Sequence, residues 1–215
     1  MANNNYISVI NELSATEGVF TTAQATRLGI TRKALSQAVS SGRAERIIHG
    51  AYRLAGTPES FIDELSAVWK LTSPSSFTYE RMKEIDWDGI AIGGATAACL
   101  LGIGDFYLSP YRIYAPKRIN SRIESASFAK RQITFGEVFW VEGLPVTCAE
   151  RTLVDLCLDY EDPSLIEDAF DDAIGKGADI EKAMAIADRV TSKRAARDAL
   201  SVLYRLIFGE GKVDE

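Results

Sequence analysis

Residues 21–56 read TTAQATRLGITRKALSQAVSSGRAERIIHGAYRLAG. Thr21 and Thr22 carry hydroxyls that can cap a helix over 23–28, and Gly29 ends that helix. Thr31 caps the next helix, over 32–41, and Gly42 stops it. Two short helices joined by a tight glycine turn are the pattern of a helix-turn-helix.

The residues on either side of this pair complete a larger pattern. Upstream, apolar residues at helical spacing predict a helix over 6–17 that Gly18 ends, and Val19 and Phe20 form a short apolar link. Downstream, strands are predicted over 44–48 and 51–54, with a turn at His49-Gly50. Three helices followed by a β-hairpin predict a winged helix-turn-helix over residues 1–56.

Charge is distributed unevenly along the chain. The whole chain has a formal net charge of -6, which argues against a nucleic-acid-binding protein when taken alone. Residues 1–56, however, hold six basic and three acidic residues, so the remaining residues carry -9. A basic module joined to an acidic body is expected when only one end contacts phosphate.

The helix over 32–41 has a polar face that favours contact with DNA bases. Arg32 or Lys33 can donate to guanine, and Gln37 can pair bidentately with adenine. Phosphates are expected at helix starts and along the hairpin, whose basic side chains can also enter the minor groove. The predicted DNA-binding residues are Thr22, Arg27, Arg32, Lys33, Ser36, Gln37, Arg43, Arg46, His49 and Arg53. Tyr52 and Ile47 are predicted to pack the hairpin onto the core.

Residues 57–215 are predicted to form a second, mixed α+β domain that begins with a helix over 58–71 whose inner face includes Phe61. Strands are predicted over 90–92, 111–115, 132–135 and 138–141, and a helix over 96–101. Thr147 and Glu150 fit a capping box that starts a helix running to Asp159. Helices over 163–174, 180–187 and 193–208 follow.

Several classes of function lack the residues that they need. The three cysteines are odd in number and lie in apolar sequence, so they are interpreted as core thiols. His49 is the single histidine, which leaves no cluster for a metal and no partner for a nucleophile. No signal peptide or membrane span is indicated, and a soluble cytoplasmic protein is expected. We therefore expect no enzyme activity, no cofactor and no metal.

Two charged features of the second region are open to more than one interpretation. A basic stretch can extend the DNA footprint, meet an acidic partner or be a solvated loop, and the last is favoured. Arg151 and Asp155 are spaced as an i, i+4 pair, which is interpreted as structural. The basic stretch comprises Arg112, Lys117, Arg118, Arg122, Lys130 and Arg131.

The sequence resembles the AbiEi-type antitoxins, a family of winged-helix transcriptional regulators. The residues that carry the likeness are Gly29-Ile30-Thr31-Arg32, then Gly42, Arg46, Gly50 and Tyr52, Tyr111-Arg112-Ile113-Tyr114, and PVTCAERTLVDL at 145–156. The resemblance implies the antitoxin of a type IV toxin-antitoxin system that represses its own operon at promoter repeats. Its implied genetic partner is a nucleotidyltransferase-like toxin, with no stable complex between the two. It also implies DNA contact by Arg46 and Arg53.

Two alternatives remain at this point. The chain can be a winged-helix protein with a DNA-directed nuclease activity, or the winged helix can bind a protein. A nuclease needs acidic residues and a lysine on adjacent strands, and only Glu210-Gly211-Lys212 approaches that pattern. The sequence gives no oligomeric state.

Overall fold

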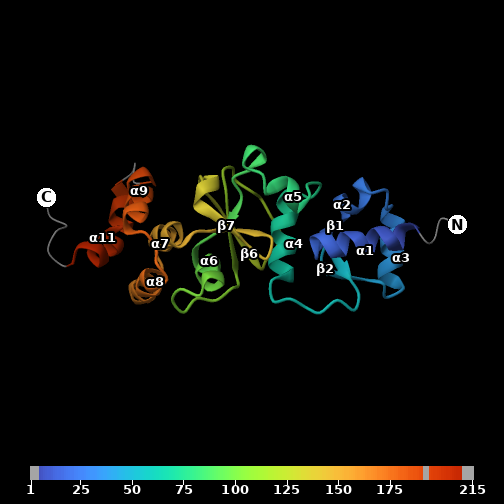
Figure 1. Cartoon of the computed structure of the whole chain (residues 1–215), viewed down its shortest axis with the longest axis horizontal. Helices are drawn as coiled ribbons and strands as arrows, with labels where there is room; N and C mark the ends of the chain where they lie inside the picture. The colour runs from blue at the N-terminus through green and yellow to red at the C-terminus, as the bar shows by residue number, and fades with distance from the viewer. Residues whose placement is uncertain (1–4, 191–193, 210–215) are drawn as a thin grey trace. The chain divides into compact units, whose positions relative to one another are not determined.

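The computed structural model describes residues 5–190 and 194–209, and the chain divides into two units, Met1–Asp88 and Gly89–Glu215. Each unit combines helices with a β-sheet, so the chain is α+β as predicted (Figure 1). The Glu210-Gly211-Lys212 element lies outside the described residues. Within 5–190 and 194–209, no helix is long and apolar enough to cross a membrane.

The first unit begins with three helices and a hairpin close to the predicted bounds. Thr21 and Thr31 each accept a hydrogen bond from the backbone three residues on, which caps the helix that follows. Phe20, expected in a link, and the capping residue Thr21 form a strand, so the sheet has three antiparallel strands in the order β1-β3-β2. The elements are α1 (Asn5–Glu17), β1 (Phe20–Thr21), α2 (Thr22–Arg27), α3 (Arg32–Ser40), β2 (Ala44–Ile48) and β3 (Ala51–Leu54).

The first unit continues past the boundary predicted at Gly56. Helix α4 (Asp63–Thr72) contacts β1, β2 and β3, and its Ala67 packs with Val19 and Ala51. Helix α5 (Thr78–Arg81) and the 3-10 helix η1 (Glu84–Asp86) complete the unit. The predicted domain boundary between residues 56 and 57 therefore differs from the boundary after Asp88 in the structure. The reason is that α4 packs on the sheet of the first unit.

The start of α4 also differs from the predicted helix over 58–71. The backbone N–H of Ser60 donates to Asp63 Oδ2 at 3.1 Å, and the helix begins only at Asp63. Phe61 consequently lies outside the helix and is 74% exposed, so its predicted place on the inner face is wrong.

A buried ion pair joins α1 to α4 inside the first unit. Lys70 Nζ lies 2.5 Å from Glu17 Oε2, and both side chains are almost fully buried. Burial lowers the pKa of Lys70, although the Glu17 carboxylate opposes that effect. Thr78 donates its backbone N–H and its hydroxyl to the same carboxylate, so the pair is well hydrogen-bonded.

The second unit is built on a mixed five-stranded sheet with the order β6-β5-β4-β8-β7. β5 pairs in parallel with β6 and antiparallel with β4, and β8 pairs in parallel with β4. The strands are β4 (Ala91–Ile92), β5 (Tyr111–Ala115), β6 (Ala126–Lys130), β7 (Val138–Val141) and β8 (Leu144–Thr147). The predicted strand over 132–135 is wrong, since β6 precedes it and the 3-10 helix η2 (Phe135–Glu137) follows.

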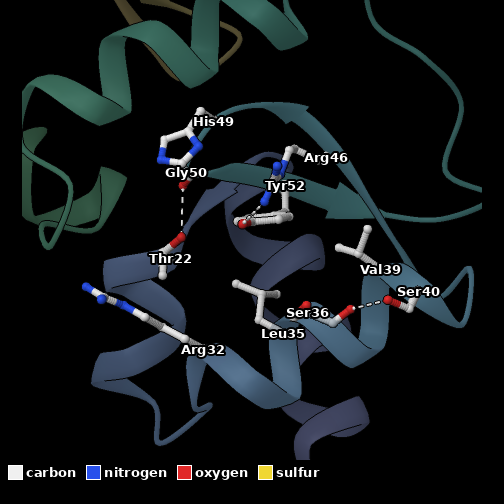
Figure 2. A pocket seen from close by; sticks show the side chains of 10 residues that line it. All are labelled: Thr22, Arg32, Leu35, Ser36, Val39, Ser40, Arg46, His49, Gly50 and Tyr52. Atoms are coloured by element: carbon white, nitrogen blue, oxygen red, sulfur yellow. Dashed lines mark hydrogen bonds between the residues drawn. The ribbon is translucent and has the colours of Figure 1, made fainter.

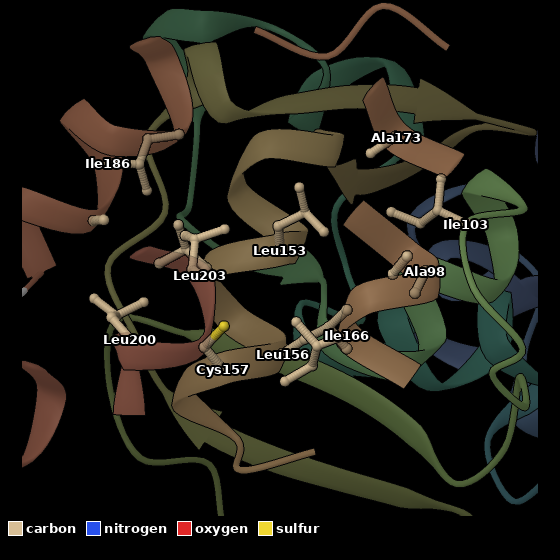
Figure 3. Packing of buried hydrophobic residues seen from close by; sticks show 13 residues of the cluster. Ala98, Ile103, Leu153, Leu156, Cys157, Ile166, Ala173, Ile186, Leu200 and Leu203 are labelled. Atoms are coloured by element: carbon tan, nitrogen blue, oxygen red, sulfur yellow. The ribbon is translucent and has the colours of Figure 1, made fainter. Parts of the chain in front are cut away.

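Helices make the main apolar core of the second unit. Leu153, Leu156 and Cys157 of α7 pack against Ile166 of α8 and Leu203 of α11 (Figure 3). The helices are α6 (Gly94–Leu101), α7 (Ala149–Leu158), α8 (Pro163–Gly175), α9 (Ile180–Val190), α10 (Arg194–Ala199) and α11 (Ser201–Phe208). The helix predicted over 193–208 is thus two helices that meet at Leu200, and its first residue lies outside the described ranges.

Helix α7 starts differently from the predicted capping box. Cys148 is the N-cap residue, and Thr147 ends β8 with its hydroxyl 2.8 Å from that of Thr152. Burial raises the pKa of Cys148 to about 11 and that of Cys157 to about 12, which fits the predicted core thiols. Cys99 is free and only partly buried.

A chain of ion pairs links β5, the residue after β6, η2 and α7 within the second unit. Arg151, 1% exposed, pairs with Asp155 at 2.9 Å and with Glu137 at 3.1 Å. Arg131 pairs with both Asp155 and Asp159, and Arg112 reaches Asp159 at 2.7 Å. The Arg151–Asp155 pair is structural as predicted. The interpretation as a solvated loop is wrong for Arg112 and Arg131. Both form ion pairs with Asp159, the residue after α7, and Arg131 also pairs with Asp155 of α7.

Candidate nucleic-acid interface

A groove in the first unit lies between α3 and the β2–β3 hairpin. Its walls come from the start of α2, one face of α3 and the hairpin with its turn (Figure 2). The lining residues are Thr22, Arg32, Leu35, Ser36, Val39, Ser40, Arg46, His49, Gly50 and Tyr52. Five of the ten predicted DNA-binding residues therefore lie together here, and no carboxylate is among the lining residues.

The groove is held in shape by local contacts between its walls. Tyr52 is 7% exposed and belongs to the apolar core, as predicted. The guanidinium of Arg46 lies over its ring, 5.7 Å from the centroid, and donates weakly to its hydroxyl at 3.5 Å. Thr22 donates its hydroxyl to the carbonyl of Gly50 at 3.4 Å. Gly50 has a φ of +90°, a turn conformation that glycine adopts without strain.

Three more predicted residues lie outside the groove but remain exposed. Lys33 and Gln37 lie on the outward face of α3, beside the groove-lining positions. Arg43 follows α3 and donates to the hydroxyl of Tyr6 at 2.9 Å. No described carboxylate forms an ion pair with Arg32, Lys33, Arg43 or Arg46. Their charges therefore remain available to an anion.

Arg53, which was predicted to contact DNA, is instead paired with carboxylates inside the first unit. It is 6% exposed, and its guanidinium contacts Glu45 at 2.7 Å, Glu59 at 2.9 Å and Asp63 at 2.7 Å. The hydrogen bond to Glu45 is the main reason why the pKa of Arg53 is raised. Glu45 is the cross-strand neighbour of Arg53 in the hairpin, so this part of the pairing follows from the register.

Arg27, which was predicted to hold a phosphate, is also paired with a carboxylate within the unit. It forms two hydrogen bonds with Glu80, at 2.8 and 2.9 Å, and donates to the carbonyl of Ser75 at 2.6 Å. Its guanidinium lies 4.5 Å from the centroid of Phe77. Most of its donors are therefore occupied.

The Arg27–Glu80 pair makes the free energy of unfolding depend on pH in the acidic range. The hydrogen bond from Arg27, helped by the backbone N–H of Phe77, lowers the pKa of Glu80 from 4.5 to about 2. A depressed carboxyl pKa stabilises the fold fully above the unfolded value and loses that effect as pH falls through the folded value. Glu80→Gln is therefore expected to lower the free energy of unfolding modestly at neutral pH, with a gap from the unmodified chain that closes between pH 4.5 and about 2. Urea unfolding across this range measures the gap.

Glu84→Gln is the matched control, because Glu84 is exposed and forms no ion pair with a described residue. It removes one negative charge from the same unit without touching the pair. A gap for Glu80→Gln that stayed constant down to pH 2, or that Glu84→Gln reproduced, would contradict the role of the pair.

The positive charge belongs to one surface rather than to the whole first unit. Residues 1–88 hold nine basic and ten acidic residues, for a net charge of -1. The excess predicted for residues 1–56 is offset by the acidic residues of α4, α5 and η1. With Arg27 and Arg53 paired, four cations without a described ion pair remain on and beside α3 and the hairpin, namely Arg32, Lys33, Arg43 and Arg46.

Sequence reasoning missed part of the groove. Ser40 was not among the predicted DNA-binding residues, and neither were the apolar residues Leu35 and Val39, which also line the groove. The i, i+4 spacing of Arg32, Ser36 and Ser40 was the signal for the groove-lining face, and the prediction included the first two of these residues. Among the described residues, no group of three or more His, Cys, Asp and Glu side chains is placed to hold a metal ion.

Comparisons with known proteins agree with this geometry. The whole chain is similar in fold to the crystal structure of the RV2827C protein from Mycobacterium tuberculosis, with a TM-score of 0.59 and 17% identity. That likeness covers 96% of this chain and 78% of the other, and it extends to the fold alone. No curated protein matches the sequence. Residues 8–55 match the family model described as transcriptional regulator, AbiEi antitoxin, a description of a regulator rather than an enzyme. This segment, which runs from α1 to the end of β3 and contains the groove, is thus of the AbiEi-type family that its sequence resembles.

Proposed function

We propose that residues 1–56 act as a winged helix-turn-helix that binds duplex DNA, and that the chain is a transcriptional repressor. The observation that carries the proposal is the groove between α3 and the hairpin, lined by two guanidinium groups, an imidazole and four hydroxyls without a carboxylate. The family description of residues 8–55 supports a regulator.

The division of α3 into two faces suggests how the duplex is contacted. Lys33 and Gln37 on the outward face reach base edges when α3 lies in the major groove. The hairpin then reaches the neighbouring minor groove of the DNA. The sugar-phosphate backbone between the two DNA grooves fits into the protein groove between α3 and the hairpin. Arg32, Arg46 and Ser36 donate to its phosphates there.

The family description of residues 8–55 also supports a proposal for the finer biological role. We propose that the chain is the antitoxin of a type IV toxin-antitoxin system and represses its own operon at promoter repeats, with the second unit serving the antitoxin role. The partner is a nucleotidyltransferase-like toxin encoded beside it. Growth of cells expressing the neighbouring gene, with and without this chain, tests that role; a neighbour without toxicity leaves a regulator only.

Gln37→Ala tests base recognition directly. Loss of one bidentate contact is expected to cost about 1–3 kcal/mol of discrimination between the DNA upstream of the chain's own gene and a shuffled duplex of equal length. The salt dependence should stay unchanged, since the side chain is uncharged. Fluorescence anisotropy over a salt series measures both quantities. Equal affinity of the unmodified chain for the two duplexes would contradict specific binding, and capture of a protein in place of DNA would favour the protein-interaction alternative.

A further inference from the structure

A short basic connection joins two neighbouring strands of the second unit. β5 and β6 are parallel, and parallel strands ordinarily need a crossover of a dozen or more residues, usually helical. Here the connection is residues 116–125, PKRINSRIES, which contain no helix. Ile119 and Ile123 are partly buried, whereas Lys117, Arg118 and Arg122 are exposed. The connection therefore presents its cations to solvent.

No ion pair with another described residue neutralises the cations of this connection. We call Lys117, Arg118 and Arg122, together with exposed Lys130 at the end of β6, the basic loop. Glu124 is the single acidic residue between 112 and 131. No described carboxylate forms an ion pair with the basic loop, although those of Asp155 and Asp159 hold both Arg112 and Arg131. The basic stretch is thus split into an internal part and an external part.

The basic loop belongs to a unit whose net charge is negative, and its positive charge contrasts with that of the rest of the unit. Residues 89–215 hold 15 basic and 20 acidic residues, so the second unit has a net charge of -5. An acidic body repels DNA at long range, and contact with phosphate then requires a local surface on which cations outnumber carboxylates. The basic loop is such a surface.

The composition of the basic loop favours phosphate over a protein partner. Protein interfaces depend on buried aromatic or aliphatic anchors, and lysine is depleted in them. Residues 116–125 contain no aromatic residue, and the two isoleucines are partly covered. What remains exposed is charge on an irregular backbone, which is how proteins contact a nucleic-acid backbone without reading sequence.

We propose that the basic loop is a second, sequence-independent contact to DNA phosphates, so that one chain holds the duplex through both of its units. The inference rests on the proposed function in that its ligand is the same DNA. Two linked contacts raise affinity because binding of one increases the effective concentration of the other. The second unit thereby strengthens binding without altering the choice of sequence.

The test uses the full chain with Lys117, Arg118 and Arg122 replaced by Ala together. Each phosphate contact contributes about 0.9 to the slope of log affinity against log salt, so the slope is expected to become shallower by about 2.7. The change should be the same on the chain's own upstream duplex and on the shuffled duplex. The ratio of the two affinities should therefore stay constant.

Two matched variants separate this contact from general electrostatics. Lys117→Arg, Arg118→Lys and Arg122→Lys in one chain keep the charge and should keep the slope. Arg197→Ala with Arg205→Ala removes exposed charge from α10 and α11 and should leave the slope unchanged. An unchanged slope in the alanine triple would overturn the inference, as would an equal loss per charge in the α10 and α11 variant.

The same measurements distinguish the inference from the proposed function. If Arg32→Ala with Arg46→Ala weakens binding and the alanine triple does not, the first unit binds DNA and the basic loop does not. If only the triple changes the slope, the basic loop is supported and the role of α3 and the hairpin fails. If the unmodified chain binds neither duplex, both proposals fail.

Discussion

Replacing Arg32 and Arg46 together with Ala is expected to weaken binding to the chain's own upstream DNA about 100-fold. Both residues line the groove between α3 and the hairpin, and no described carboxylate pairs with either. A hydrogen bond to a charged group is worth about 1.5 kcal/mol at the low end, so two of them amount to about 3 kcal/mol. The slope of log affinity against log salt should become shallower by about 1.8. Fluorescence anisotropy over a salt series measures both changes.

Two control variants show whether the effect belongs to the groove. Arg32→Lys with Arg46→Lys keeps the charges and should keep the salt slope, while losing part of the affinity because lysine lacks the planar fork of arginine. Lys83→Ala removes an exposed charge from the first unit at a position between α5 and η1 and should change affinity less than twofold. Equal losses from Lys83→Ala and from either arginine alone would show that only net charge matters.

Replacing Arg151 with Met is expected to lower the free energy of unfolding of the second unit by about 3–5 kcal/mol, because it removes the fully buried partner that Asp155 and Glu137 share. Arg151 is 1% exposed, and its partners Asp155 and Glu137 are 0% and 3% exposed. Burial raises the pKa of Asp155, and this effect is larger than the opposite effect of Arg151 and Arg131 on the same carboxylate. Urea unfolding measures the loss, and hydrogen exchange on α7 peptides assigns it to this unit.

Lys182→Ala is the exposed counterpart of that change. Lys182 Nζ lies 3.3 Å from Glu150 Oε2, and the lysine side chain is 40% exposed. An exposed pair of this kind is worth about 0–1 kcal/mol, so the loss should be small. If Arg151→Met cost no more than Lys182→Ala, the chain of buried ion pairs would not be a structural support of the second unit.

Local signals in the sequence account for the segments that were predicted accurately. Thr31 and Gly42 bound α3, and the two-residue turn at His49-Gly50 sets β2 and β3, because caps and turns depend on neighbours only a few residues away. β5 was predicted at its observed bounds because it is aromatic and β-branched. These elements place the groove-lining face of α3 beside the hairpin.

Strands with weak intrinsic preference were missed for the opposite reason. β6 is ASFAK, with little β-branched content, and forms as an edge strand on β5. β8 contains Pro145, which lacks a backbone donor and argues against a strand inside a sheet, yet it pairs with β7 and β4. Pairing with strands remote in the chain outweighs local preference, and a single sequence does not display that pairing.

The residue pattern alone specified a polar α3, a basic hairpin and an α+β chain, since these properties belong to short segments. The availability of each charge depended on tertiary contacts. Arg27 meets Glu80 from 53 residues away, and Arg53 meets Glu59 and Asp63 because α4 lies against the sheet. A guanidinium that already donates its hydrogen bonds to carboxylates has few N–H donors free to bind a phosphate. Which arginines can reach DNA is therefore a property of the folded chain.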